Sequence, residues 1–370
     1  MLSEDADGFV YDEFGFAYPA DELQGQILSL SEEMTRRAPD QLHLFEKFSE
    51  VHGRSIPSAE FIAKVDKEGY LKASCRAGLP MEARIPLWMQ LSSAASVIAL
   101  AVRTYTMYRD EVKDLRELDA AGEKIDVSTH TAFKCIDLDV DRTFPGAKFV
   151  EAGSEFSDSL RDILCCFALA EPRIGYCQGI NFIAGFLLHM VTVHEHCTYR
   201  QAEERSFWLL KVLVGKILGV ETFSPTLENL HTELRMIDAL AQTRVSFFKS
   251  MSRSDQMKHS AVFYATSWML TAYINVLPAY VVLRILDACF YEGNKVLFRI
   301  AVALIESCES ELERAEGIYE RLKLLRDPGL FVYSADTLMK RAFEIPRFSR
   351  KKLEKLHDKA VEMENHGDSK

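Results

Sequence analysis

The sequence contains no apolar run as long as the roughly 18 residues that a membrane-spanning helix requires. Its best apolar stretch, residues 180–193, is interrupted by His189. The first seven residues, MLSEDAD, are acidic and lack the basic and apolar regions of a secretory signal peptide. We therefore expect a cytoplasmic protein without a transmembrane segment.

A cysteine framework and an excess of basic charge are also missing. The eight cysteines show no framework spacing, so without an export signal we expect reduced thiols, most of them in the core. Lys and Arg total 44 against 55 Asp and Glu, which gives a net charge of −11. Because this charge repels polyanions, no nucleic-acid partner is expected.

Several enzyme motifs are absent as well. Residues 215–216, Gly-Lys, resemble the end of a P-loop, but the first glycine and the final Ser/Thr are missing. The chain is therefore not expected to hydrolyse nucleotides itself. No Gly-x-Ser-x-Gly, His-Glu-x-x-His or Cys-x-x-Cys occurs. His194, His196 and Cys197 lie close together without an evident fourth ligand, so we interpret them as a helix-end cluster and expect no metal site.

The sequence is rich in apolar residues at helical spacing, whereas strand alternation is scarce. Residues 261–277 are apolar on nearly all sides, which predicts a buried central helix that ends near Pro278. No repeat of fixed period is present, which argues against a solenoid. The predicted class is all-α. The predicted helices cover residues 156–170, 182–193, 227–240, 261–277, 279–291, 295–306 and, at the surface, 350–370.

Residues 136–145, with the sequence IDLDVDRTFP, do not have the composition of plain core. Their alternating acids fit either a short strand or the start of a helix, where carboxylates favour the positive end of the dipole. Asp139 and Arg142 are three residues apart and can pair on one helical face. The pair can be a surface ion pair worth less than about 1 kcal/mol. Alternatively, Asp139 holds an arginine whose planar fork is presented to phosphate oxygens.

A second unusual segment is residues 173–181, RIGYCQGIN, between two strongly apolar helical stretches. Its glycines permit positive φ or close backbone approach, so Gln178 can be held rigidly at the surface. The alternative is an ordinary helix connection in which Tyr176 packs and Gln178 is merely solvated.

Three short motifs occur in order along the chain: Arg84-x-x-x-Trp88, Ile136-x-x-Asp139-x-x-Arg142 and Tyr176-Cys177-Gln178-Gly179. Together they resemble the signatures of the TBC domain, the catalytic module of Rab GTPase-activating proteins. Residues 267–269 and 283–294 are similar to the family's C-terminal helices, although Leu286 stands where many members carry Trp. The resemblance implies a multi-helix TBC-type domain over residues 75–312. An N-terminal flanking segment (1–74) and C-terminal helices with a charged tail (313–370) complete the expected organisation.

The resemblance also implies a mechanism. Arg142 acts as an arginine finger, and Gln178 orients the attacking water in place of the GTPase's own glutamine. Asp139 aims Arg142, while Tyr176 and Gly179 set the loop that carries Gln178. These roles are expectations from the motifs.

For the first motif, the resemblance implies that Arg84 and Trp88 mainly hold the helical frame. The expected partner is a Rab-family GTPase in its GTP form, which brings GTP and Mg²⁺, so no cofactor of the chain's own is expected. The implied setting is vesicle trafficking, with only indirect membrane contact through the lipid-anchored Rab. Two other interpretations stay open: a catalytically silent Rab-binding scaffold, and a structural helical protein without a nucleotide-dependent partner.

Overall fold

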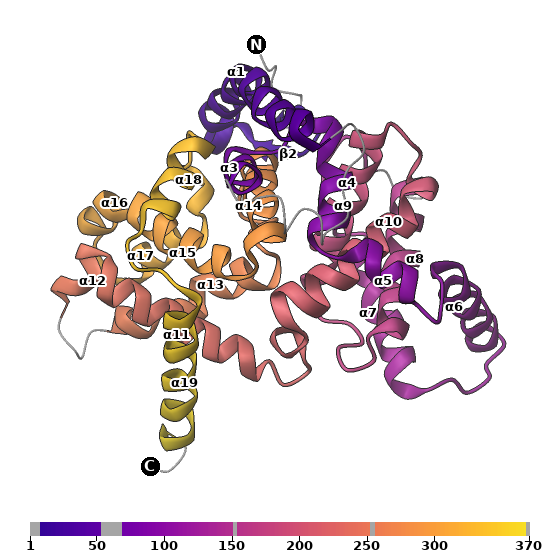
Figure 1. Ribbon diagram of the computed structural model, residues 1–370. Helices are drawn as coiled ribbons and strands as arrows, with labels where there is room; N and C mark the ends of the chain where they lie inside the picture. Colours follow the sequence, from indigo (N-terminus) through magenta and orange to yellow (C-terminus); the bar gives the residue numbers. More distant parts are fainter. Residues whose placement is uncertain (1–7, 53–68, 151–153, 252–255, 368–370) are drawn as a thin grey trace.

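The computed structural model describes residues 8–52, 69–150, 154–251 and 256–367. Over these ranges the chain is almost entirely helical, and its strands are confined to one short hairpin (Figure 1). The predicted all-α class is confirmed. Of the helices in the described ranges, none is both long enough and apolar enough to cross a bilayer.

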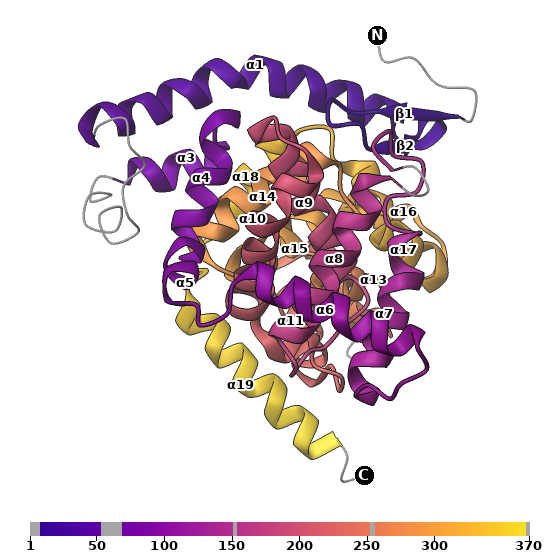
Figure 2. The ribbon, with the colours of Figure 1, turned by 90° about the vertical axis from the view of Figure 1, so that its right-hand side faces the viewer.

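The described chain starts with the hairpin and a long helix. Strands β1 (Phe9–Tyr11) and β2 (Ala17–Pro19) pair in antiparallel orientation, with Val10 opposite Tyr18. Helix α1 (Ala20–His52) follows directly and runs across the top of the molecule in Figure 2. Of the predicted segment 1–74, residues 1–7 and 53–68 lie outside the described ranges.

The next helices, with the connections between them, contain all three motifs. Helix α9 is buried on almost every side and packs against both α8 and α10, and these helices form the centre of the N-terminal half (Figure 2). A side-chain cap starts α8, because Ser154 accepts a hydrogen bond from the Ser157 backbone N–H. The helices of this half are α3 (Tyr70–Ala77), α4 (Met81–Leu91), α5 (Ala94–Leu100), α6 (Tyr105–Ala120), α7 (Val127–Val140), α8 (Glu155–Ala170), α9 (Ile180–Glu195) and α10 (Tyr199–Val212).

The C-terminal half contains the other buried helices, α14 and α15. Its elements are η2 (Leu213–Gly219), η3 (Val220–Phe223), α11 (Glu228–Arg244), α12 (Ser246–Ser250), η4 (Gln256–His259), α13 (Ala261–Leu270), α14 (Ala279–Glu292), α15 (Lys295–Ser307), α16 (Glu309–Arg314), α17 (Gly317–Arg326), η5 (Pro328–Phe331), α18 (Ala335–Glu344) and α19 (Arg350–Gly367). Helices α8, α9, α11, α14, α15 and α19 confirm six of the predicted helices. Residues 368–370 of the predicted tail lie outside the described ranges.

The predicted helix over residues 261–277 is wrong in its second part. Helix α13 ends at Leu270, because Ala272 (φ +47°) and Tyr273 (φ +68°) adopt the left-handed conformation that breaks a right-handed helix. The expected burial is also incomplete, since Phe263 is 66% exposed. Uniform apolarity predicted a buried segment but could not reveal the turn inside it.

Residues 136–141 form neither a strand nor the start of a helix. They lie at the C-terminal end of α7, which begins much earlier, after the N-cap Asp126. The acids therefore face the negative end of the helix dipole, opposite to the expectation. Arginines from neighbouring helices offset this charge: Arg116 and Arg161 bind Asp137 at 2.9 Å and 3.2 Å.

Hydrogen bonds connect the hairpin to α9, to the chain at residue 148 and to the start of α14. The His189 ring donates to the Phe14 carbonyl at 2.7 Å, and the Lys148 backbone N–H donates to the Gly15 carbonyl at 2.9 Å. The Tyr18 hydroxyl accepts from the first backbone N–H of α14 at 2.9 Å. The hairpin thus borders the chain that follows Arg142.

Candidate functional site

The first part of the candidate site is the Arg142 segment (residues 139–143), at the end of α7. Asp139 is 3% exposed, whereas the Arg142 side chain is 59% exposed. The Arg142 Nε donates to Asp139 Oδ1 at 2.7 Å. The cation offsets both the buried carboxylate and the negative helix end. Arg142 Nη2 contacts the same oxygen, so the ion pair holds one edge of the guanidinium while the side chain stays more than half exposed.

The second part is the Gln178 segment (residues 176–181), which connects α8 to α9. The Tyr176 hydroxyl donates to Asp139 Oδ2 at 2.5 Å. Burial, and then the hydrogen bond to Asp139, raise the pKa of Tyr176 well above its usual value. Tyr176 therefore stays a protonated donor at physiological pH, and the two oxygens of Asp139 hold the two segments together.

A second buried chain of hydrogen bonds links the same segments. The Thr143 hydroxyl donates to the Asp139 carbonyl at 2.7 Å and accepts from the Asn181 amide at 2.8 Å. The Asn181 Oδ1 then accepts from the Gly179 backbone N–H at 3.0 Å. Because Thr143 and Asn181 are 0% and 1% exposed, these bonds are shielded from water.

Gly179 lets the Gln178 segment approach the C-terminal half of the molecule. Its φ is +113°, and a Cβ at this position would lie 2.9 Å from the Leu270 carbonyl oxygen at the end of α13. Only glycine fits this contact without movement of backbone. The preceding Gln178 is exposed.

The predicted residues thus divide into exposed and supporting groups. Arg142 offers a partly exposed guanidinium that is paired with Asp139, and Gln178 is exposed. The segments that carry them are joined through Asp139 and Asn181. Such a surface can bind oxyanions and orient a polar molecule beside them. The described residues contain no group of three or more His, Cys, Asp or Glu side chains placed to hold a metal ion.

The first motif lies in a separate buried cluster centred on Asp287, the Asp287 cluster. The Arg84 Nε donates to Asp287 Oδ1 at 3.1 Å, and the Trp88 indole donates to the same oxygen at 2.8 Å. The Leu79 backbone N–H donates to Asp287 Oδ2 at 2.8 Å, and Arg84 Nη1 donates to His194 Nε2 at 2.8 Å. These contacts join α4, α9 and α14.

The Asp287 cluster and the candidate site lie at opposite ends of α9. His194 is in the last turn of this helix and Ile180 is in its first, so they are about 20 Å apart at 1.5 Å per residue. Burial and the Arg84 charge lower the pKa of His194 to about 3, and its Nδ1–H donates to the Met190 carbonyl at 2.7 Å. Both nitrogens of the neutral ring are therefore engaged within the protein.

The sequence motifs assign no role to three of the supporting residues. Thr143 and Asn181 lie within the two unusual segments, and Asp287 lies within the C-terminal residues that resemble the family. Asn181 carried a usable signal, because a polar residue beginning an almost wholly apolar helix needs a buried partner. Nothing local in the sequence indicates that Asp287 pairs with Arg84.

The fold and the three motifs are those of a TBC domain. The Rab-GTPase-TBC domain profile matches residues 81–313, more than half of the chain, and the chain belongs to this family. A Rab-family GTPase is therefore the partner class that the fold implies.

Named relatives agree with this assignment. The chain is 28% identical to Growth hormone-regulated TBC protein 1 of Xenopus tropicalis, over 80% of this chain and 81% of the relative. It is 30% identical to Growth hormone-regulated TBC protein 1-A of Danio rerio, over 79% and 77%. The Chlamydomonas flagellar RabGAP TBC domain matches with a TM-score of 0.64 and 26% identity, over 90% of this chain and 100% of that structure.

Proposed function

We propose that this protein accelerates GTP hydrolysis by a GTP-bound Rab-family GTPase, with Arg142 as an arginine finger and Gln178 as the residue that orients water. The observation that carries the proposal is the shared carboxylate of Asp139, which binds Arg142 and Tyr176. This carboxylate links the segments that carry the exposed Arg142 and Gln178 side chains, which supports a shared site.

The chemistry requires little beyond positioning and charge. During hydrolysis, negative charge grows on the phosphoryl oxygens, and a guanidinium fork can stabilise it more strongly than in the ground state. The Gln178 amide can donate to one acceptor and accept from the attacking water. GTP and Mg²⁺ enter with the partner, so the chain supplies only side chains. An arginine finger accelerates turnover by about 10³–10⁵-fold, which is roughly 4–7 kcal/mol.

The test is single-turnover GTP hydrolysis over a panel of purified Rabs, with Arg142→Ala and Arg142→Lys compared to the native chain. We expect Arg142→Ala to lower the stimulated rate by about 10³-fold or more, and the lysine variant to recover little, because it lacks the planar fork. The matched control is Arg314→Ala, since Arg314 also pairs with an acid three residues earlier, Glu311, at 3.5 Å.

Gln178→Ala addresses the second role. We expect a smaller loss of rate, because the GTPase's own glutamine can partly resume water positioning, and the losses from Arg142 and Gln178 should not add. Circular dichroism checks that each variant is folded. Near-normal stimulation by folded Arg142→Ala would contradict the arginine-finger assignment. Binding of GTP-loaded Rabs by the native chain without any stimulation would instead favour a Rab-binding scaffold.

A further inference from the structure

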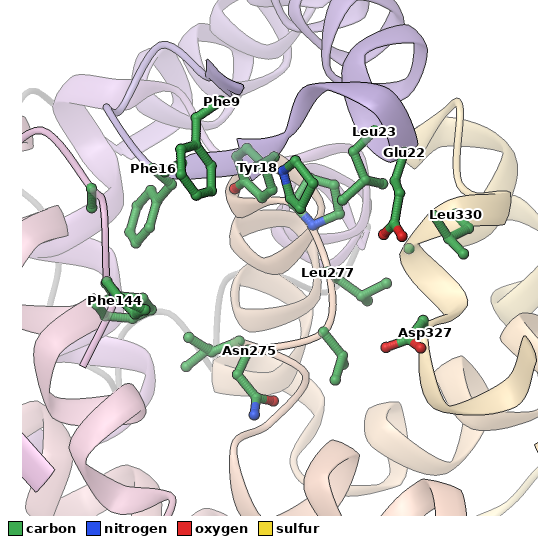
Figure 3. A pocket seen from close by; sticks show the side chains of 18 of the residues that line it. Phe9, Phe16, Tyr18, Glu22, Leu23, Phe144, Asn275, Leu277, Asp327 and Leu330 are labelled. Carbon is green, nitrogen blue, oxygen red and sulfur yellow. The ribbon is translucent and has the colours of Figure 1, made fainter. Parts of the chain in front are cut away.

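A pocket of about 380 Å³ adjoins the Arg142 segment (Figure 3). Phe144 and Pro145 form part of its wall, and Phe182, in the first turn of α9, also lines it. Phe144 is two residues beyond Arg142, so their Cα atoms are at most about 8 Å apart. Residues 16–19 and 274–278 line other sides of the pocket, which is therefore built from both halves of the molecule.

One end of the pocket is aromatic and preformed. Figure 3 shows Phe9, Phe16 and Phe144 together at this end. The Phe144 ring packs edge-on against Phe16 at 5.0 Å and Phe182 at 5.4 Å between centroids. These contacts hold Phe144 in a left-handed conformation, φ +55°, that a bulky side chain rarely adopts. The aromatic end can therefore receive an apolar group without rearrangement.

The opposite end is acidic. The carboxylates of Glu22 and Asp327 lie there, across the pocket from the phenylalanines (Figure 3). Both residues are exposed, and neither forms an ion pair within the described ranges. Among the residues that the structure describes, no basic side chain lines the pocket. Two negative charges beside an apolar chamber are complementary to a ligand that joins an apolar group to a cation.

We propose that this pocket binds a surface segment of the partner GTPase in which an apolar side chain lies next to a lysine or arginine. The inference rests on the proposed function, because the pocket wall at Phe144 is two residues from Arg142, the position to which the GTPase would bring its nucleotide. The pocket makes no contact with the phosphoryl group, so it contributes to the choice of GTPase and to affinity, and not to the chemical step.

The test is a double variant, Glu22→Gln with Asp327→Asn, measured against a responsive Rab. We expect a three- to tenfold rise in KM, and the same rise in Kd for the Rab loaded with a non-hydrolysable GTP analogue, with kcat within twofold of the native value. Association should slow, and its salt dependence should flatten, because rim charges act mainly on the rate of encounter. Asp21→Asn is the matched control: it removes an acid from the same helical turn but does not line the pocket.

Charge exchange identifies the partner's cation. Lys→Glu and Arg→Glu substitutions are made one at a time across the Rab surface. One of these Rab variants should bind the native chain more weakly, and Glu22→Lys in this protein should restore its binding. Unchanged KM and Kd in the double variant would overturn the pocket inference even if Arg142→Ala abolishes turnover. If the native chain binds GTP-loaded Rabs without stimulating hydrolysis, the proposed function fails, while the Kd series still decides the pocket. Absence of binding to any Rab overturns both.

Discussion

At the scale of single residues, Asp139 is the central group of the candidate site. Its two carboxylate oxygens accept hydrogen bonds from residues of different segments, Arg142 and Tyr176. Because Asp139 is almost fully buried, loss of either donor leaves a charge with fewer partners in a poorly solvated place. Turnover should therefore respond to Tyr176 although its hydroxyl group is not proposed to touch the substrate.

We predict that Tyr176→Phe lowers the stimulated rate about tenfold and the free energy of unfolding by about 1–2 kcal/mol, since a hydrogen bond to a charged group is lost. Single-turnover hydrolysis and urea unfolding measure the two effects. Tyr199→Phe is the control, because the Tyr199 hydroxyl bonds the His189 side chain at 2.9 Å, away from the Arg142 segment. It should reduce stability without a comparable loss of turnover; an equal loss in both variants would show that Tyr176 acts only through stability.

The sequence could predict part of this site. Asp139 and Arg142 are three residues apart, a spacing that predicts their ion pair, and the structure shows the pair with Arg142 just beyond the C-terminal end of α7. The Tyr176–Asp139 hydrogen bond spans two segments separated by α8, and local patterns do not encode such contacts. Only the resemblance to the family motifs could predict this contact, because it assigns both segments to one site.

At the scale of elements, the connection between α8 and α9 matters because it contacts both halves of the molecule. Asn181 ties it to the Arg142 segment, and Gly179 abuts the Leu270 carbonyl at the end of α13. The unexpected end of α13 at Leu270 is therefore part of what positions Gln178.

Gly179→Ala should reduce stability by about 2–4 kcal/mol, because the new Cβ meets backbone at 2.9 Å and φ is +113°. Turnover at saturating Rab should also fall, since relief of the clash displaces Gln178. The measurements are thermal unfolding and kcat.

Gly175→Ala is the matched control in the same connection. Gly175 also has positive φ, +60°, but no heavy atom lies within 4 Å of the position that an added Cβ would occupy. We expect a cost of only about 1–2 kcal/mol from the left-handed backbone and near-normal kcat. Equal effects of the two alanines would refute the importance of the Leu270 contact.

Helices could be predicted from the sequence where apolar periodicity was the dominant signal and no contact with a distant segment altered the backbone. Helices α8 and α9 follow from apolar periodicity and length. Periodicity failed within residues 261–277, where a tight turn is as apolar as the helix before it. It also failed for residues 136–141, whose acids are stabilised by Arg116 and Arg161 from other helices and not by the dipole of their own.

At the scale of the whole molecule, the Asp287 cluster joins the halves away from the candidate site. Asp287 is 0% exposed and receives hydrogen bonds from Arg84, Trp88 and the Leu79 backbone. Helix α4 thereby binds to α14, which the sequence places about 200 residues later. Arg84 is also buried, so it depends on Asp287 for its counter-charge.

Asp287→Ala should lower the free energy of unfolding by about 3–5 kcal/mol, because it leaves the Arg84 cation buried without its partner. Urea unfolding by circular dichroism measures the loss. Removal of an exposed acid, Asp358→Ala, is the control, since its 3.8 Å contact with His357 is solvent-exposed and should change stability by less than about 1 kcal/mol. A small effect of Asp287→Ala would mean that water or another acid compensates Arg84.

The separation of the two clusters along α9 has a consequence in living cells. Substitutions in the Asp287 cluster raise the fraction of unfolded chains, which quality-control proteases remove, so steady-state abundance should fall. A substitution at Gln178 removes an exposed side chain and should preserve normal abundance. An abundant but inactive form would still occupy its Rab and compete with the native protein, whereas a degraded form would not. Dominant phenotypes should therefore map to the candidate site at the N-terminal end of α9. Recessive phenotypes should map to the Asp287 cluster at its C-terminal end.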